Sequence, residues 1–165
     1  ISSLKEINLE RMKLEKLPKG IGSAKSLQNL NLMGIKLTEI PESIGNLSNL
    51  ELLNLGNNKI NVLPKSFKKL SSLKQLSLID NKVTNLEDAI LNCSNLEILD
   101  ISGNNLTSIP ESVRNNRNLK QLILSQNKNG LLSTLNVGNL NPCPLKKMDN
   151  INATLLLLMF PSTGA

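Results

Sequence analysis

Apolar residues recur along this chain with a period of twenty-three residues. At the start of each unit, apolar and polar residues alternate over a few positions, which predicts a short strand with one buried face. Because one unit cannot bury its own apolar face, the units must stack to form a common core. Three apolar positions stay in register through six units: Leu4, Leu27, Leu50, Leu73, Leu96 and Leu119; Ile7, Leu30, Leu53, Leu76, Leu99 and Leu122; and Leu9, Leu32, Leu55, Leu78, Ile101 and Leu124.

The second half of the unit predicts a turn. Proline follows Leu or Ile at Pro18, Pro41, Pro64 and Pro110, and proline ends a strand and favours a turn or a first helical position. The residues that follow are too few for a long helix, so we expect one short helical or 3₁₀ turn per unit. In the fourth unit Glu87 replaces the proline, which favours a fuller helical turn. Crossovers in one sense make successive strands parallel.

An asparagine stands at the ninth position of the last four units. A side-chain amide there can hydrogen-bond to backbone groups in the bend after each strand, and stacking would turn these bonds into a ladder. Met12 and Ile35 occupy this position in the first two units. The backbone groups of those bends therefore find other hydrogen-bond partners, or the bends are less firmly held. We assign a structural role to Asn58, Asn81, Asn104 and Asn127.

The repeat is similar to that of the leucine-rich repeat family. The resemblance rests on Leu50-x-x-Leu53-x-Leu55-x-x-Asn58-x-Ile60 and its copies, and the 23-residue length with the proline segment resembles Ras-suppressor-type or plant intracellular units. It implies an α/β fold, a right-handed leucine-rich repeat solenoid with a curved parallel sheet and short convex helical or 3₁₀ turns. It also implies a module that binds proteins, with a small GTPase or a phosphatase as the kind of partner.

We divide the chain into two parts. Residues 1–129 form an array of about six repeats that start at 4, 27, 50, 73, 96 and 119, and 130–165 form a degenerate repeat, a C-terminal cap or a tail. The register ends where Asn129 replaces an apolar residue, and a cap would cover the exposed core and sheet edge of the last repeat. The apolar run 155–160 is far shorter than the ~20 residues that span a bilayer. The alternative is a disordered tail that favours aggregation.

The composition argues against catalysis and against metal or cofactor binding in this chain. The chain has no His, which removes the commonest general base, and it has neither a phosphate-binding glycine loop nor a cysteine cluster with metal-ligand spacing. We therefore expect no enzyme activity, no cofactor and no metal site. The net charge of +6 comes from lysines spread along the chain, and aromatic residues make up only 1% of it. Without aromatic platforms for bases we expect no nucleic-acid binding.

The remaining candidate site is the concave face of the sheet. Residues between the buried positions of each strand point to the other side, and a contiguous exposed apolar patch usually marks a partner site. The competing explanation is that parallel strands favour β-branched residues in any case. The predicted partner-binding residues are Met33, Leu52, Asn54, Gln75, Ile79, Asp80, Ile98, Asp100, Gln121 and Ile123.

These observations predict a non-catalytic protein–protein interaction module, a monomeric fragment of a larger signalling or scaffold protein. Two unclustered cysteines, Cys93 and Cys143, fit a reducing compartment, so we expect a cytoplasmic location. One alternative is a ligand-sensing receptor segment of extracellular or immune type, which would be secreted or at the cell surface. The other is the substrate-recognition arm of a larger enzyme.

Overall fold

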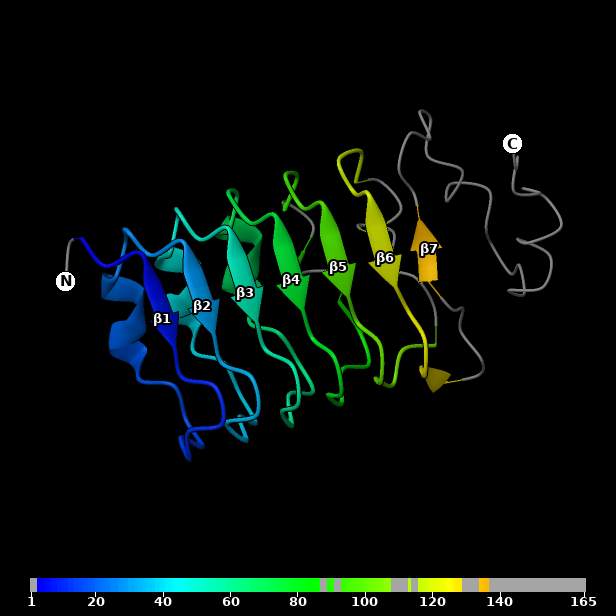
Figure 1. Cartoon of the computed structure of the whole chain (residues 1–165), viewed down its shortest axis with the longest axis horizontal. Coiled ribbons are helices and arrows are strands. Elements are labelled where there is room, and N and C mark those ends of the chain that lie inside the picture. Colours follow the sequence, from blue (N-terminus) through cyan, green and yellow to red (C-terminus); the bar gives the residue numbers. More distant parts are fainter. Residues whose placement is uncertain are drawn as a thin grey trace, which may run out of the picture.

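The computed structural model describes residues 3–86, 89–90, 93–107, 113, 116–128 and 134–136. Within these residues the chain forms one seven-stranded sheet in which the strands follow the order of the sequence (Figure 1). The strands are Glu6–Asn8 (β1), Asn29–Asn31 (β2), Leu52–Asn54 (β3), Gln75–Ser77 (β4), Ile98–Asp100 (β5), Gln121–Ile123 (β6) and Thr134–Asn136 (β7).

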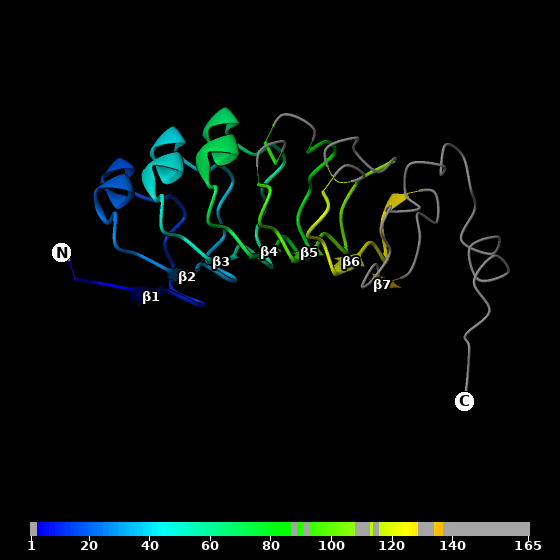
Figure 2. The same cartoon turned by 90° about the horizontal axis from the view of Figure 1, so that it is seen from above.

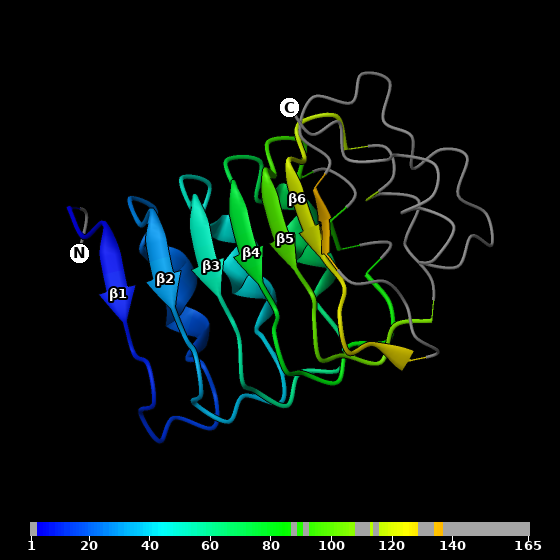
Figure 3. The same ribbon diagram turned by 45° about the vertical axis from the view of Figure 1, so that its right-hand side comes forward.

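Strands β1 to β6 are parallel and share one register. Each residue pairs with the residue twenty-three positions later, as in Ile7 with Leu30 and Leu30 with Leu53. Backbone pairing continues beyond the strand ends, since Asn57 N–H donates to the Ile79 carbonyl at 2.7 Å. The result is the predicted solenoid, with a curved and open sheet (Figure 3).

The predicted convex turns are 3₁₀ helices in the first three repeats. They span Lys19–Ser23 (η1), Glu42–Asn46 (η2) and Lys65–Lys69 (η3), and all three lie on one side of the sheet (Figure 2). The proline comes just before the first helical residue, with φ between −60° and −69° and an extended ψ. The turns expected after Leu86 and Pro110 fall largely outside the described residues.

The apolar positions of the repeats form one continuous core. Leu27, Leu50 and Leu73 are fully buried, as are the anchors that follow them in their strands. Leu4 is different, because 43% of it is exposed. Within the described residues its repeat packs against one neighbouring repeat, which leaves this leading leucine more exposed than its equivalents.

The last strand runs in the opposite direction to the others. β7 is antiparallel to β6, with Leu122 paired to Leu135. Ten residues, 124–133, separate the two strands, and a parallel return needs a crossover of about a dozen or more. The expected degenerate repeat therefore does not add another parallel strand here. The rest of the predicted cap or tail lies outside the described residues.

Two glycines allow the convex 3₁₀ helices to pack closely. A Cβ at Gly22 would clash with the Ser43 carbonyl of the next repeat, and one at Gly45 would clash with the Ser66 carbonyl and lie 2.6 Å from Ser66 Cβ. Gly20, in the same helix as Gly22, has no atom within 4 Å of such a Cβ. Close approach of backbones therefore requires glycine at only one of these two places in η1.

We predict that Gly45→Ala destabilises the protein and Gly20→Ala does not. The added methyl group at residue 45 meets backbone atoms that cannot move away, and overpacking of this kind costs about 1–3 kcal/mol. At residue 20 the methyl group points into open space, so the free energy of unfolding should stay within about 1 kcal/mol of the wild-type value. Urea denaturation of the three proteins measures both effects. Equal stability of the two variants would contradict the packing argument.

Candidate functional site

The concave face contains a hollow that spans four strands. Its volume is about 280 Å³, and seven of the ten predicted partner-binding residues line it, together with Leu53, Leu76 and Ser77. Met33, Asp80 and Gln121 are outside the lining. The seven are Leu52, Asn54, Gln75, Ile79, Ile98, Asp100 and Ile123.

The apolar residues around the hollow are half-buried. We expected exposed side chains, but Leu52, Ile79 and Ile98 each have intermediate exposure, as do Met33 and Ile123. Side chains on one face of neighbouring strands stand only about 5 Å apart, so each covers part of the next. The concave face therefore presents an apolar hollow rather than separate projecting side chains.

Two of the predicted binding residues also hold the backbone. Asn54 Oδ1 accepts the N–H of Gly56 at 3.0 Å, and Asp100 Oδ1 accepts the N–H of Ser102 at 3.0 Å. Asn8 and Asn31 make the same bond at the equivalent place in their repeats. This is an Asx turn, in which the side chain satisfies a backbone N–H two residues later. The polar residues at this repeat position therefore have a structural role as well.

Asp80 occupies a bend that repeats along the sheet. The eighth residue of each unit has a left-handed conformation, with φ between 52° and 69°, and Asn, Asp and Gly tolerate it best. The Asp80 carboxylate lies over Gly103, where a Cβ would clash with it. The residues at this eighth position are Arg11, Gly34, Asn57, Asp80, Gly103 and Gln126, and Lys36, at the tenth position of its unit, also has a positive φ of 65°.

The charge of the concave face differs from that of the whole chain. The chain carries +6, yet Arg11 is the one basic residue among the outward positions of strands β1 to β6 and the bends that follow them. Arg11 already pairs with Glu10 at 3.5 Å. Asp80 and Asp100 form no ion pair within the described residues. The strip around the hollow is therefore acidic on a basic molecule.

The predicted asparagines form a hydrogen-bonded ladder between repeats. Asn81 Oδ1 accepts the N–H of Ile60 at 3.0 Å, and its Nδ2 donates to the Leu55 carbonyl at 2.9 Å and to the Leu78 carbonyl at 3.1 Å. Asn58, Asn104 and Asn127 make equivalent bonds. Each amide therefore ties its own bend to the repeat before it. In the first two repeats Ile35 is fully buried, whereas Met12 is 50% exposed.

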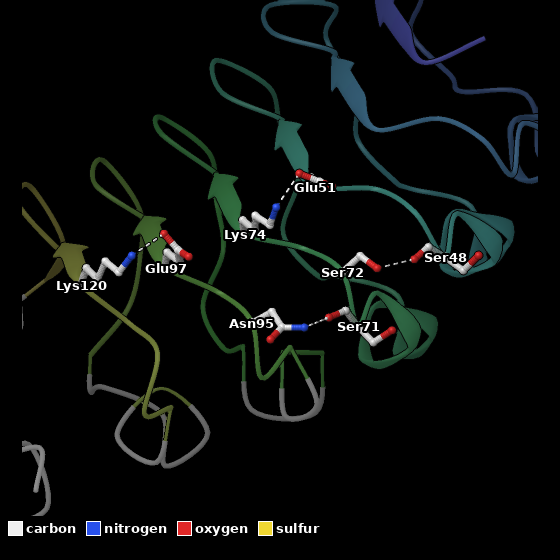
Figure 4. A network of polar contacts seen from close by, with 8 residues as sticks. All are labelled: Ser48, Glu51, Ser71, Ser72, Lys74, Asn95, Glu97 and Lys120. Carbon is white, nitrogen blue, oxygen red and sulfur yellow. Dashed lines mark hydrogen bonds and ion pairs between the residues drawn. The ribbon is translucent and has the colours of Figure 1, made fainter. Parts of the chain in front are cut away.

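A second ladder, which was not among the predictions, precedes the strands. Asn95 Nδ2 donates to the Ser71 carbonyl at 2.8 Å, and Ser72 Oγ donates to the Ser48 carbonyl at 2.7 Å (Figure 4). Asn49 and Asn118 make the same type of bond. The signal in the sequence is a Ser or Asn directly before the leading leucine of each repeat after the first.

Alternating charges pair at the start of the strands. Glu51 pairs with Lys74 at 2.7 Å, and Glu97 pairs with Lys120 at 2.8 Å (Figure 4). The hydrogen bond from Lys120 lowers the pKa of Glu97, and the bond to Glu51 raises the pKa of Lys74. All four side chains are exposed, where such pairs contribute little stability. The two pairs do neutralise the charges of these four side chains at the start of the strands.

Cys93 is a buried thiol rather than a reactive one. Its Sγ lies 3.6 Å from the Phe67 carbonyl, and burial raises its pKa to about 11. In the part of the chain that the structure describes, no three His, Cys, Asp or Glu side chains are grouped to hold a metal ion. A search of the same residues found no helix of the length and apolarity needed to cross a membrane.

Comparison with known proteins establishes the family. A family model described as a leucine-rich repeat region matches residues 1–83, and a model described as leucine rich repeat matches residues 76–128. The chain belongs to the leucine-rich repeat family. The family that the Leu50-x-x-Leu53-x-Leu55-x-x-Asn58 motif and its copies resemble is thus confirmed. No curated protein matches this leucine-rich repeat chain.

Solved leucine-rich repeat structures share the fold. A leucine-rich repeat protein of Leptospira interrogans is 35% identical with a TM-score of 0.62, and the ectodomain of the Arabidopsis thaliana receptor kinase GASSHO1/SCHENGEN3 is 36% identical with a TM-score of 0.70. Internalin C2 of Listeria monocytogenes is 26% identical with a TM-score of 0.69. Each match covers 76% of this chain, which spans 38%, 16% and 53% of the respective structures.

We predict that Asn81→Ala destabilises the protein far more than Asn95→Ala. Loss of the Asn81 amide leaves buried backbone groups of two repeats without partners, at a cost of about 2–4 kcal/mol. Asn95 is exposed and donates one bond, so water replaces it at a cost below about 1 kcal/mol. Urea denaturation measures both values. Similar losses of unfolding free energy in the two variants would show that the buried asparagine bonds stabilise the protein no more than the exposed ones.

We predict that Cys93 reacts with thiol reagents only when the protein opens. In a Cys143→Ser variant Cys93 is the one remaining thiol. With a pKa of about 11, the thiolate fraction at pH 8 is about one thousandth, and only the thiolate is nucleophilic. Labelling with dithionitrobenzoate should be at least about 100-fold slower than in 6 M guanidinium and should accelerate with pH. Labelling as fast as that of a free cysteine would contradict this.

Proposed function

We propose that this chain is a non-catalytic module that binds a protein partner through its concave face, within a larger signalling or scaffold protein. The observation that carries the proposal is the hollow of about 280 Å³, whose apolar walls come from four successive strands. Apolar side chains that surround a hollow exclude water over a contiguous area when a partner covers them.

The size of the face supports a protein rather than a small molecule. The hollow lies just below the range of about 300–1,000 Å³ that small-molecule pockets occupy. Six strands spaced about 4.8 Å apart extend roughly 24 Å, and twenty-four outward positions match the 20–30 residues that a protein interface uses on each side. A small GTPase or a phosphatase is the kind of partner that we propose from the family likeness.

We further propose that 1–129 act as the binding array and that 130–165 form a degenerate repeat, a C-terminal cap or a tail. The buried free thiol of Cys93 supports a reducing compartment and hence a cytoplasmic module. The likeness to a plant receptor ectodomain, which was solved in complex with CASPARIAN STRIP INTEGRITY FACTOR 2, supports a ligand-sensing receptor segment as the second candidate. Both candidates use the same face, so one experiment tests the site for either.

The test compares capture of partners by wild-type protein and by two variants. Leu52→Gln/Ile98→Gln removes two apolar walls, and glutamine already occupies the equivalent positions as Gln75 and Gln121. The control Val62→Asn removes an apolar side chain, 64% exposed, outside the concave face. Partners captured from source-cell lysate are identified by mass spectrometry, and their Kd values are then measured with purified components.

We predict that the wild type and the Val62→Asn control retain the partner equally, and that the concave variant binds at least about tenfold more weakly. The loss of two half-buried aliphatic side chains at an interface justifies this magnitude. Circular dichroism and thermal melting establish that all three proteins are folded. Unchanged affinity of the concave variant would exclude the concave face as the binding site.

A further inference from the structure

We propose that the partner places an aliphatic side chain in the hollow and a lysine or arginine side chain beside it, against Asp100 and Asp80. This rests on the proposed function of the concave face and specifies the chemistry of its partner. The apolar walls define the first part of the occupant, and the two carboxylates, which have no ion pair within the described residues, define the second.

The walls of the hollow are aliphatic. Leu52, Ile79, Ile98 and Ile123 are half-buried and line it, and no aromatic side chain is among the lining residues. An apolar cavity of about 150 Å³ holds one benzene molecule, so a hollow of about 280 Å³ has room for one or two side chains. A leucine, isoleucine or methionine of a partner fits this space.

Polar groups at the edge of the hollow remain available. The Ser102 N–H and hydroxyl both donate to one carboxylate oxygen of Asp100, at 3.0 Å and 2.7 Å. The second carboxylate oxygen has no hydrogen-bond partner among the described residues, and neither does the Gln75 amide. An ionised carboxylate beside apolar walls gains most from a charge-assisted bond to an ammonium or guanidinium group.

Asp80 and Asp100 differ from the acidic side chains nearby on the same side of the sheet in having no basic neighbour within the described residues. Glu10, Glu51 and Glu97 each have a basic neighbour in an ion pair. No Lys or Arg occupies an outward position of β3 to β6 or the bends after them, so Asp80 and Asp100 have no such neighbour there. An acidic segment would be repelled at this place, whereas a basic one would complete the missing pairs.

The chain itself supplies the substitutions that test the idea. Asp100→Asn keeps the Oδ1 that accepts the Ser102 N–H, since Asn54 and Asn31 fill the same role in earlier repeats. Asp80→Asn places asparagine where the chain already uses Asn57 with φ of 54°. The double variant therefore removes two charges and keeps both backbone functions. Glu15→Gln/Glu39→Gln removes two exposed charges outside the concave face as the matched control.

The probes are synthetic Gly/Ser peptides with a central leucine and one neighbour varied among Lys, Arg, Ala and Glu. The full chain is labelled at isoleucine δ1 methyl groups, and each peptide is titrated at low salt while the NMR shifts are followed. The methyl groups of Ile79, Ile98 and Ile123 report binding in the hollow, and the buried Ile44 and Ile60 serve as internal references.

We expect Leu–Lys and Leu–Arg peptides to shift the three hollow methyl groups and to bind at least tenfold more tightly than Leu–Glu peptides. In Asp80→Asn/Asp100→Asn the Lys and Ala peptides should bind within about twofold of each other. The Glu15→Gln/Glu39→Gln control should keep the wild-type preference.

Three results would overturn the inference: equal binding of Lys and Glu peptides, a Lys preference that survives in the double Asp variant, or no shift of the hollow methyl groups with any peptide. In the first two cases the Leu52→Gln/Ile98→Gln variant separates the two proposals. If it abolishes peptide binding, the hollow is a binding site and only the assigned partner chemistry is wrong. If it binds peptides as the wild type does, the concave-face proposal fails as well.

Discussion

The buried asparagine amides are the interaction on which the rest of this structure depends. Each strand ends in a bend whose backbone N–H and carbonyl groups turn away from water, and an unpaired buried group of this kind costs about 1–3 kcal/mol. Asn58, Asn81 and Asn104 satisfy these groups in their own repeat and in the one before. A single side chain therefore fixes the bend and the register between repeats, and leucine packing alone could not set that register so narrowly.

That fixed register creates the concave face that we propose as the binding site. Equivalent residues of successive repeats pair directly, so the side chain at a given repeat position lies beside the side chains at the same position of the neighbouring repeats. The hollow arises where four neighbouring repeats replace polar residues with Leu52, Ile79, Ile98 and Ile123. The scaffold is constant and the face is variable, so binding specificity can change without loss of the ladders that hold the fold.

The sequence was sufficient for features that repeat and insufficient for features that occur once. Six aligned units predicted the parallel strands, the 3₁₀ turns and the buried positions. The half-burial of Ile98 was not predictable, because it depends on which side chains stand beside it in other repeats. The Asx turn of Asp100 does not follow from the pattern either, because the equivalent position holds Asn54 in one repeat but Ile123 in another. The antiparallel β7 lies beyond the periodic region, where no second copy defines its pairing.

Net charge is a poor guide to the chemistry of the partner that we propose. The chain carries +6, which on its own favours an acidic partner at long range. Screening limits that field to about 8–10 Å at moderate ionic strength, so at contact the local side chains decide. On the concave face these are Asp80 and Asp100 beside an aliphatic hollow, while the nearby glutamates are already paired with basic neighbours. The net charge of the chain and the local charge of the concave face can differ because strand residues alternate. The core leucines point inward, and the outward positions can carry a charge of their own.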